Sequence, residues 1–138
     1  MNRNKKRTAA SLLLLVLLLI FWLACNPFGR FGWCSFGFTI YNAIPRPVTD
    51  IQVRSDGKVR TVAKTHDLGM ENIRWLLDPL PDILIIATGW DGVTIPRKEI
   101  EDLTACEVRI LKTREARKLF NQMKKSGRRV AIHYHSTC

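Results

Sequence analysis

Acidic residues are scarce in this sequence, and one long stretch has no charge at all. The chain has 12 Asp and Glu against 22 Lys and Arg, which gives a formal net charge of +10. The residues from Thr8 to Gly29 carry no charge, and the centre of this stretch, Leu12–Leu23, is almost wholly Leu, Val, Ile, Phe and Trp. A helix of about 20 such residues crosses the hydrocarbon core of a bilayer. The stretch therefore predicts a membrane helix, and its apolarity on all faces is not typical of an amphipathic mitochondrial transit peptide.

Several standard catalytic and zinc-binding motifs are also missing. The four cysteines form no C-x-x-C pair, which argues against a zinc ribbon or a thioredoxin-like redox motif. Four cysteines in a chain of 138 residues do not make a disulfide framework. There are no paired carboxylates, no serine triad motif, no G-x-G-x-x-G and no phosphate loop. These absences favour a non-catalytic protein without a cofactor or metal, although they leave open whether it is an enzyme.

The leader, residues 1–29, consists of a basic stub and the apolar stretch. An uncleaved single-pass anchor is the favoured interpretation, and a cleaved signal peptide is an alternative. Trp22-Leu23-Ala24-Cys25 faintly resembles a lipoprotein cleavage box, so a lipid-anchored, exported protein is another alternative. Four basic residues precede the apolar stretch and only Arg30 closely follows it, which predicts a cytoplasmic amino end and a domain on the far side of the membrane.

A basic surface remains when the stub is set aside. Beyond Cys25 the chain has 18 Lys and Arg against 12 Asp and Glu. The densest basic run, 114–129, contains a single acid, Glu115, and a single aromatic residue, Phe120, which does not make the interleaved aromatic pattern of single-strand binders. We therefore expect a solvated basic surface and no nucleic-acid partner.

Residues 38–138 are predicted to form one α/β domain, joined to the leader by a Gly- and aromatic-rich linker at 30–37. A strand is expected at Phe38–Tyr41, ended by prolines 45 and 47. Alternating residues at 51–54 and 59–62 flank Ser55-Asp56-Gly57-Lys58, which is a strong hairpin signal. The short, continuously apolar run Ile83–Ala87 predicts a strand buried on both faces. Further strands are expected at 107–111 and 129–134.

Three helices are predicted between these strands. Ile73, Leu76 and Leu77 share one face of a helix over 68–77, and a second helix is expected from Thr94-Ile95-Pro96 to about residue 105. A third helix begins near Thr113, a favourable N-cap, and ends at Gly127. Helices alternating with strands predict a mixed, largely parallel sheet.

An ordered set of motifs resembles a known family. The motifs are Pro81–Gly89, Thr113-Arg114-Glu115-Ala116, Phe120-Asn121, Gly127–Ala131 and His135-Ser136-Thr137-Cys138. Together they resemble the Mth nine-three-eight-like domain family, which includes a mitochondrial complex I assembly factor and an adipogenesis-associated protein. The resemblance implies a mixed sheet with helices in β+α/β/α layers, and it implies no catalytic activity. The family has no leader of this kind, and Ala87 stands where it usually has Gly.

A ligand-binding pocket is hypothesised around the loop that follows the buried strand. Ligands of open α/β sheets collect outside the carboxyl ends of strands, and glycines let a backbone approach an anion. The candidate residues are Thr88, Gly89, Trp90, Thr113 and Asn121. A tight turn without a ligand is the favoured interpretation of the Thr88–Gly92 loop.

His133, His135 and Cys138 form H-x-H-x-x-C, whose atom types suit zinc. With only three ligands clustered, a packed terminal strand is the favoured interpretation, and a Cys138–His135 nucleophile and base is the less favoured one.

The sequence as a whole favours a membrane-anchored, non-catalytic α/β domain that binds a protein partner or helps an assembly. The rival hypothesis is a small-molecule-binding protein or enzyme that uses a pocket near Thr88–Gly92 and Thr113.

Overall fold

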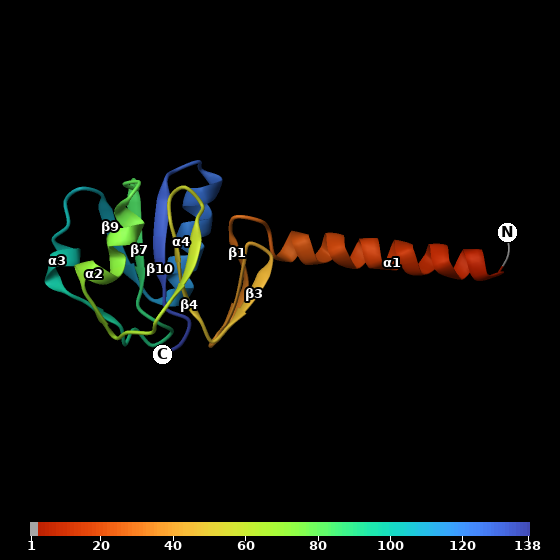
Figure 1. The fold of residues 1–138 in the computed structure, drawn as a ribbon, viewed down its shortest axis with the longest axis horizontal. Helices are drawn as coiled ribbons and strands as arrows, with labels where there is room; N and C mark the ends of the chain where they lie inside the picture. Colours follow the sequence, from red (N-terminus) through yellow and green to blue (C-terminus); the bar gives the residue numbers. More distant parts are fainter. Residues whose placement is uncertain (1–2) are drawn as a thin grey trace.

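In a computed structural model, which describes residues 3–138, a long helix precedes a folded α/β domain (Figure 1). Helix α1 spans Arg3–Cys25 and contains no buried residue. It is long and apolar enough to cross a membrane. At its end, Asn26 connects it to the domain, because the Asn26 amide donates to the Trp22 carbonyl and its side-chain oxygen accepts from the Trp33 amide.

A small antiparallel sheet lies between α1 and the rest of the domain (Figure 1). Its strands are β1 (Phe31–Ser35), β2 (Phe38–Tyr41) and β3 (Ile44–Pro47). Strand β1 therefore occupies much of the segment that we expected to be a linker. We had expected the prolines at 45 and 47 to break the strand. Instead they pair with β2 in the edge strand β3, where a missing N–H costs no ladder bond. Asn42 and Ala43, both at positive φ, make the turn before it.

The central sheet has five strands in the order β5-β4-β10-β7-β9. They are β4 (Asp50–Val53), β5 (Val59–Val62), β7 (Ile83–Ala87), β9 (Glu107–Leu111) and β10 (Val130–Tyr134). Strands β7, β9 and β10 pair in parallel, whereas β4 pairs antiparallel with β10 and β5. The mixed α/β class is confirmed, but the sheet is not largely parallel as predicted, because only half of its pairings are parallel. A two-stranded sheet of β6 (Asp67–Leu68) and β8 (Ile95–Pro96) lies apart.

Strand β7 separates two hydrophobic cores. All five of its residues are buried, as the continuous apolar run predicts. Ile83, Ile85 and Ala87 pack into a core covered by helix α4 (Thr113–Lys125) and the β1–β3 sheet. Leu84 and Ile86 pack into a second core beneath α2 (Met70–Ile73), the 3₁₀ helix η1 (Arg74–Leu77) and α3 (Lys98–Glu101).

The helices differ from prediction in three places. The helix predicted over 68–77 is α2 followed by the 3₁₀ helix η1, and Leu68 lies in strand β6 instead. Helix α3 covers only Lys98–Glu101, because Ile95 and Pro96 pair with β6 and so cannot begin a helix. Thr113 is not the N-cap of α4: that position belongs to Lys112, and the Thr113 hydroxyl is hydrogen-bonded elsewhere. Gly127 ends α4 with φ of +77°, as predicted.

Candidate functional site at the carboxyl end of the sheet

The segment that follows β10 folds against the loop that follows β7. The Trp90 amide donates to the Thr137 carbonyl over 2.8 Å, and the Trp90 indole donates to the Ser136 carbonyl over 3.1 Å. The Thr113 hydroxyl donates to the His135 carbonyl (2.7 Å) and accepts from the Gly89 amide (3.1 Å). Four of the five predicted ligand residues therefore gather here, and three of them position residues 135–138.

Gly89 is the closest point between the two segments. Its φ is +101°, and a Cβ built on it would lie 1.7 Å from the Cys138 carbonyl oxygen. Only glycine fits at this position, because it lacks a Cβ and adopts positive φ at little cost. The backbone of Cys138 therefore lies directly against Gly89, where the sequence predicted a ligand.

The remaining two predicted ligand residues, Thr88 and Asn121, form hydrogen bonds elsewhere. The Thr88 hydroxyl donates to the Leu111 carbonyl of β9. Asn121 is apart from the loop: its amide pairs with both the N–H and the carbonyl of Phe31, each over 2.8 Å. Asn121 therefore ties α4 to strand β1. A ligand role for these five residues stays a prediction.

A buried carboxylate, which the sequence analysis did not single out, organises the site. Asp50 is fully buried at the start of β4. One carboxylate oxygen accepts from Lys64 Nζ (2.8 Å), the Ser136 amide (2.9 Å) and the Ser136 hydroxyl (3.0 Å), and the other lies 2.5 Å from His135 Nδ1. Burial by itself raises the pKa of Asp50, but the hydrogen bonds from His135, Lys64 and the Ser136 amide outweigh it and hold this pKa well below its ordinary value. Asp50 is therefore a carboxylate at neutral pH.

His133 lies on the same sheet face as His135 but has different partners. Its Nδ1 is 3.0 Å from Nε2 of Gln52. The Gln52 oxygen accepts two hydrogen bonds from Arg60, and its Nε2 also donates to the Asn72 carbonyl, so His133 Nδ1 must be the acceptor. Burial lowers the pKa of His133 to about 4, despite the opposing charge of Asp50. His133 is thus a neutral histidine held by Gln52.

His66, which the sequence analysis did not consider, is brought to the site by the loop before β6. Its Nε2 lies 3.7 Å from Cys138 Sγ, and its ring meets that of His135 edge-on, with centroids 5.3 Å apart. A cavity of about 250 Å³ is lined by Lys64, Thr65, His66, Thr137 and Cys138. No sequence motif joins His66 to residues 135–138, because the contact depends on the path of the chain between β5 and β6.

The fold, together with residues 135–138, which we call the closing segment, defines a small mixed α/β domain. The comparisons identify its family. A model of a protein family of unknown function (DUF498/DUF598) matches residues 33–135. The chain therefore belongs to this family, which confirms the Mth nine-three-eight-like resemblance.

Solved structures share the fold. The protein MT938 is 29% identical, with a TM-score of 0.67, over 79% of this chain and 98% of its own. A conserved hypothetical protein from Pyrococcus horikoshii is 23% identical, with a TM-score of 0.68, over 79% of this chain and 99% of its own. A protein from Bordetella parapertussis is 17% identical, with a TM-score of 0.60, over 78% and 94%. No curated protein matches the chain.

Proposed function

We propose that the protein is a single-pass membrane protein whose α/β domain binds a protein partner and catalyses no reaction. Helix α1 would span the bilayer with its amino end in the cytoplasm, and the domain, residues 31–138, would stand on the far side. The observation that carries the proposal is the exposure of α1.

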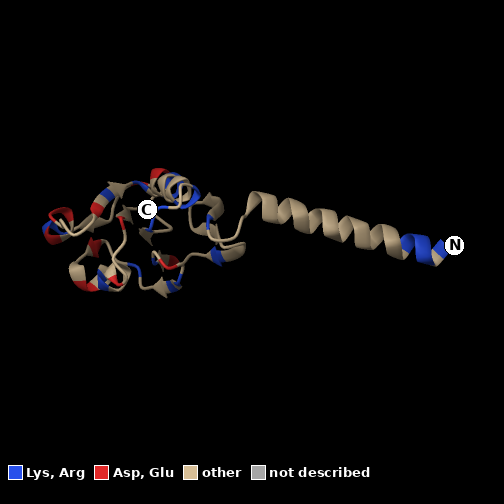
Figure 2. Ribbon diagram, turned by 90° about the horizontal axis from the view of Figure 1, so that it is seen from above, with Lys and Arg blue, Asp and Glu red and all other residues tan. Residues whose placement is uncertain are grey.

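Among residues 3–138, helix α1 has no buried residue, and near its carboxyl end the Trp22 indole donates to the Ala43 carbonyl. Its large apolar residues from Leu12 to Trp22 are between 39% and 69% exposed, on every side of the helix. Figure 2 shows the helix without charge along its length except at the amino end. So large an exposed apolar surface is unfavourable in water and favourable in a bilayer.

The relatives support an added anchor. MT938 aligns over 98% of its own length, and yet only 79% of this chain is covered. The family match begins at residue 33, after α1 has ended. In MT938 the folded domain makes up almost the whole chain, whereas here it is attached to a helix long enough to span a membrane.

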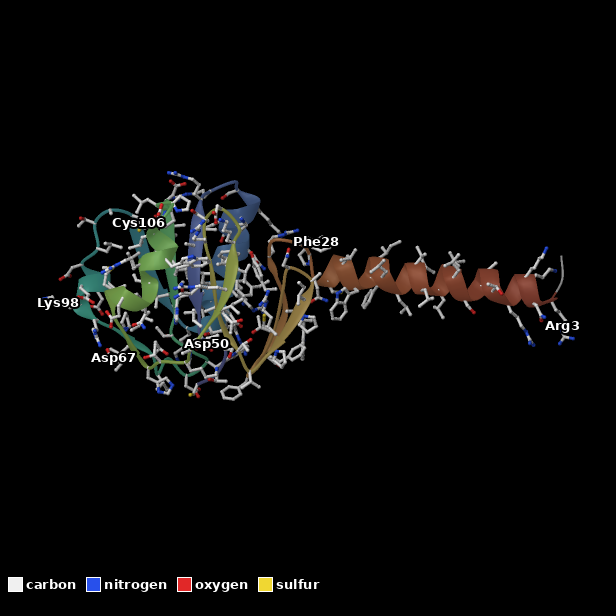
Figure 3. All side chains as sticks on the ribbon, in the orientation of Figure 1. Arg3, Phe28, Asp50, Asp67, Lys98 and Cys106 are labelled. Atoms are coloured by element: carbon white, nitrogen blue, oxygen red, sulfur yellow. The ribbon has the colours of Figure 1, made fainter. Side chains whose placement is uncertain are left out.

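The small sheet beside α1 offers an apolar surface for a partner. Exposed hydrophobic side chains gather on and around strands β1 to β3, and we call this set the apolar collar: Phe28, Trp33, Phe36, Ile44 and Val48. Figure 3 shows Phe28 where α1 joins the sheet. Contiguous exposed apolar residues mark protein or membrane contacts.

Flotation with phospholipid vesicles tests the anchor. The full chain is expected to float with the vesicles, whereas a chain of residues 26–138 is expected to stay at the bottom of the gradient, since the apolar surface of α1 is removed. Replacing Leu15 and Leu18 by Arg should also reduce flotation, because a charge in the bilayer centre costs about 2.5–3.5 kcal/mol per residue. Flotation of residues 26–138 equal to that of the full chain would disprove the role of α1.

Photo-crosslinking in native membranes tests the partner. A crosslinking residue at Trp33 is expected to capture one protein reproducibly, because Trp33 is 60% exposed in the apolar collar. The matched position is Lys98 in the exposed helix α3, across the domain from α1 (Figure 3). Capture of lipid alone at Trp33, or of the same proteins from both positions, would contradict a protein-binding collar.

A further inference from the structure

Three metal-ligating side chains converge beside the cavity near Cys138, and two of them, His66 and Cys138, line it. One donor atom each from His66, His135 and Cys138 lies within 4.8 Å of the other two. His66 comes from the loop before β6, and the other two come from the segment after β10. His66 is exposed, Cys138 is half-buried and His135 is fully buried, so the cluster leads from the cavity mouth into the domain.

The orientation of His135 is fixed by Asp50. The Asp50 carboxylate, 2.5 Å from Nδ1, accepts a hydrogen bond from the Nδ1–H, so Nε2 is the ring nitrogen that can donate a lone pair to a metal ion. Nε2 is buried and has no hydrogen-bond partner among residues 3–138. Buried polar atoms are rarely left unpaired, so this atom calls for a ligand. A carboxylate that holds the far nitrogen of a histidine is the usual outer contact of a metal-bound imidazole.

The spacing between two of the donors suits a tetrahedral ion. Bond lengths of about 2.0–2.1 Å to nitrogen and 2.3 Å to sulfur place tetrahedral N and S ligands about 3.6 Å apart. His66 Nε2 and Cys138 Sγ are 3.7 Å apart. The contact of the Cys138 backbone with Gly89 and the hydrogen bonds to Trp90 hold the thiol at this place.

We propose that His66, His135 and Cys138 bind one divalent transition-metal ion of the zinc type. Nitrogen and sulfur donors select such an ion over Mg²⁺ or Ca²⁺, which prefer oxygen. Three protein ligands leave a fourth coordination position, and the 250 Å³ cavity gives it access to water or a small anionic ligand beside Lys64. The H-x-H-x-x-C pattern therefore contributes two ligands instead of three, because Gln52 holds His133 and His66 takes its place.

Cobalt titration tests the site. The full chain, without a polyhistidine tag and reduced with a phosphine, is titrated with Co²⁺ in detergent micelles. We expect one ion per chain, visible bands of tetrahedral Co²⁺ and a thiolate-to-cobalt charge-transfer band, all of which Zn²⁺ removes. His66→Ala and Cys138→Ser should each weaken binding at least tenfold, and Cys138→Ser should abolish the charge-transfer band.

The controls distinguish a built site from adventitious binding. Cys106→Ser removes a half-buried thiol outside the cluster and should leave the titration unchanged. His66 is exposed, so His66→Ala should keep the wild-type circular dichroism spectrum, and its loss of binding then reports ligation. A Co²⁺ titration without a charge-transfer band, or binding by His66→Ala as tight as that of the wild type, would overturn the proposal. Persistence of the band in Cys138→Ser, or its loss in Cys106→Ser, would do the same.

Discussion

Four buried polar residues share one face of the central sheet. Asp50 and Gln52 project from β4, and at the same spacing of two His133 lies in the neighbouring strand β10 and His135 directly after it. Each histidine is hydrogen-bonded by the β4 residue across from it, Gln52 for His133 and Asp50 for His135. The Gln52 amide donates to His133, which is neutral. The Asp50 carboxylate instead accepts from His135 Nδ1, so that Nε2 can donate a lone pair to a metal ion.

His133 should make the domain sensitive to mild acid. Its pKa of about 4 lies below the ordinary histidine value of about 6.5, so between these pH values the unfolded chain binds a proton that the folded chain does not. Stability must then fall as the pH is lowered from about 6.5 to 4, by about 3 kcal/mol if His133 acts alone. Urea unfolding of residues 26–138 across this range measures the loss.

His133→Asn is the matched control for this prediction. The Asn side-chain oxygen can accept from Gln52 in place of Nδ1, and it does not titrate. The variant should keep a flatter profile between pH 6.5 and 4. Asp50 does not confuse the comparison, since its lowered pKa makes it lose stability only at more acidic pH, below the ordinary carboxyl value. An equally steep profile in His133→Asn would assign the acid sensitivity to another group.

The sequence predicted the face on which the two histidines lie, but it did not predict their partners. The alternation in β10 correctly places His133 and His135 on one face. Asp50 and His66 were missed, because a single Asp at a strand start and a single His in a loop carry no pattern. Their roles depend on antiparallel pairing of β4 with β10 and on the loop that returns to Cys138, and both are long-range contacts.

The closing segment, residues 135–138, packs against the Thr88–Gly92 loop. We predict that Gly89→Ala destabilises residues 26–138 more than Gly57→Ala does. Both glycines have positive φ, of +101° and +89°, but only at Gly89 would a Cβ meet backbone atoms, those of Cys138. The φ penalty of about 1 kcal/mol is common to both, and overpacking should add about 1–3 kcal/mol at Gly89. Denaturant midpoints measure the difference.

The comparison isolates the contact from the backbone conformation. A Cβ on Gly57 has no atom within 4 Å, so Gly57→Ala reports the φ penalty alone. Equal losses in the two variants would show that residues 135–138 are not held against Gly89. In that case the position of Cys138 would also lack its support.

At the scale of elements, strong local patterns were predictive and weak ones were not. The apolar run of β7, the Asp-Gly hairpin between β4 and β5 and the amphipathic α4 all match prediction. Strand β3 and helix α3 do not, because the proline rules do not tell whether a strand is at an edge or whether Ile95 pairs with β6. Strand β1 was missed since its Gly- and Cys-containing sequence has little alternation, and Asn121 and the packing of Phe31 stabilise it.

The whole molecule combines a family domain with an element outside the family match. The domain carries two cores, a buried polar row and a closing segment, and MT938 aligns with it over nearly its whole length. Helix α1 extends from the small sheet (Figure 1) and buries no residue of its own. The central claim is that α1 stays on the mature protein as its membrane anchor.

Intact-mass measurement on carbonate-washed membranes tests this claim most directly. Alkaline carbonate releases peripheral proteins and retains integral ones. The account predicts a carbonate-resistant chain whose mass includes the residues of α1, because α1 is an uncleaved span. A chain released by carbonate, or one that begins at or beyond Cys25, would contradict it.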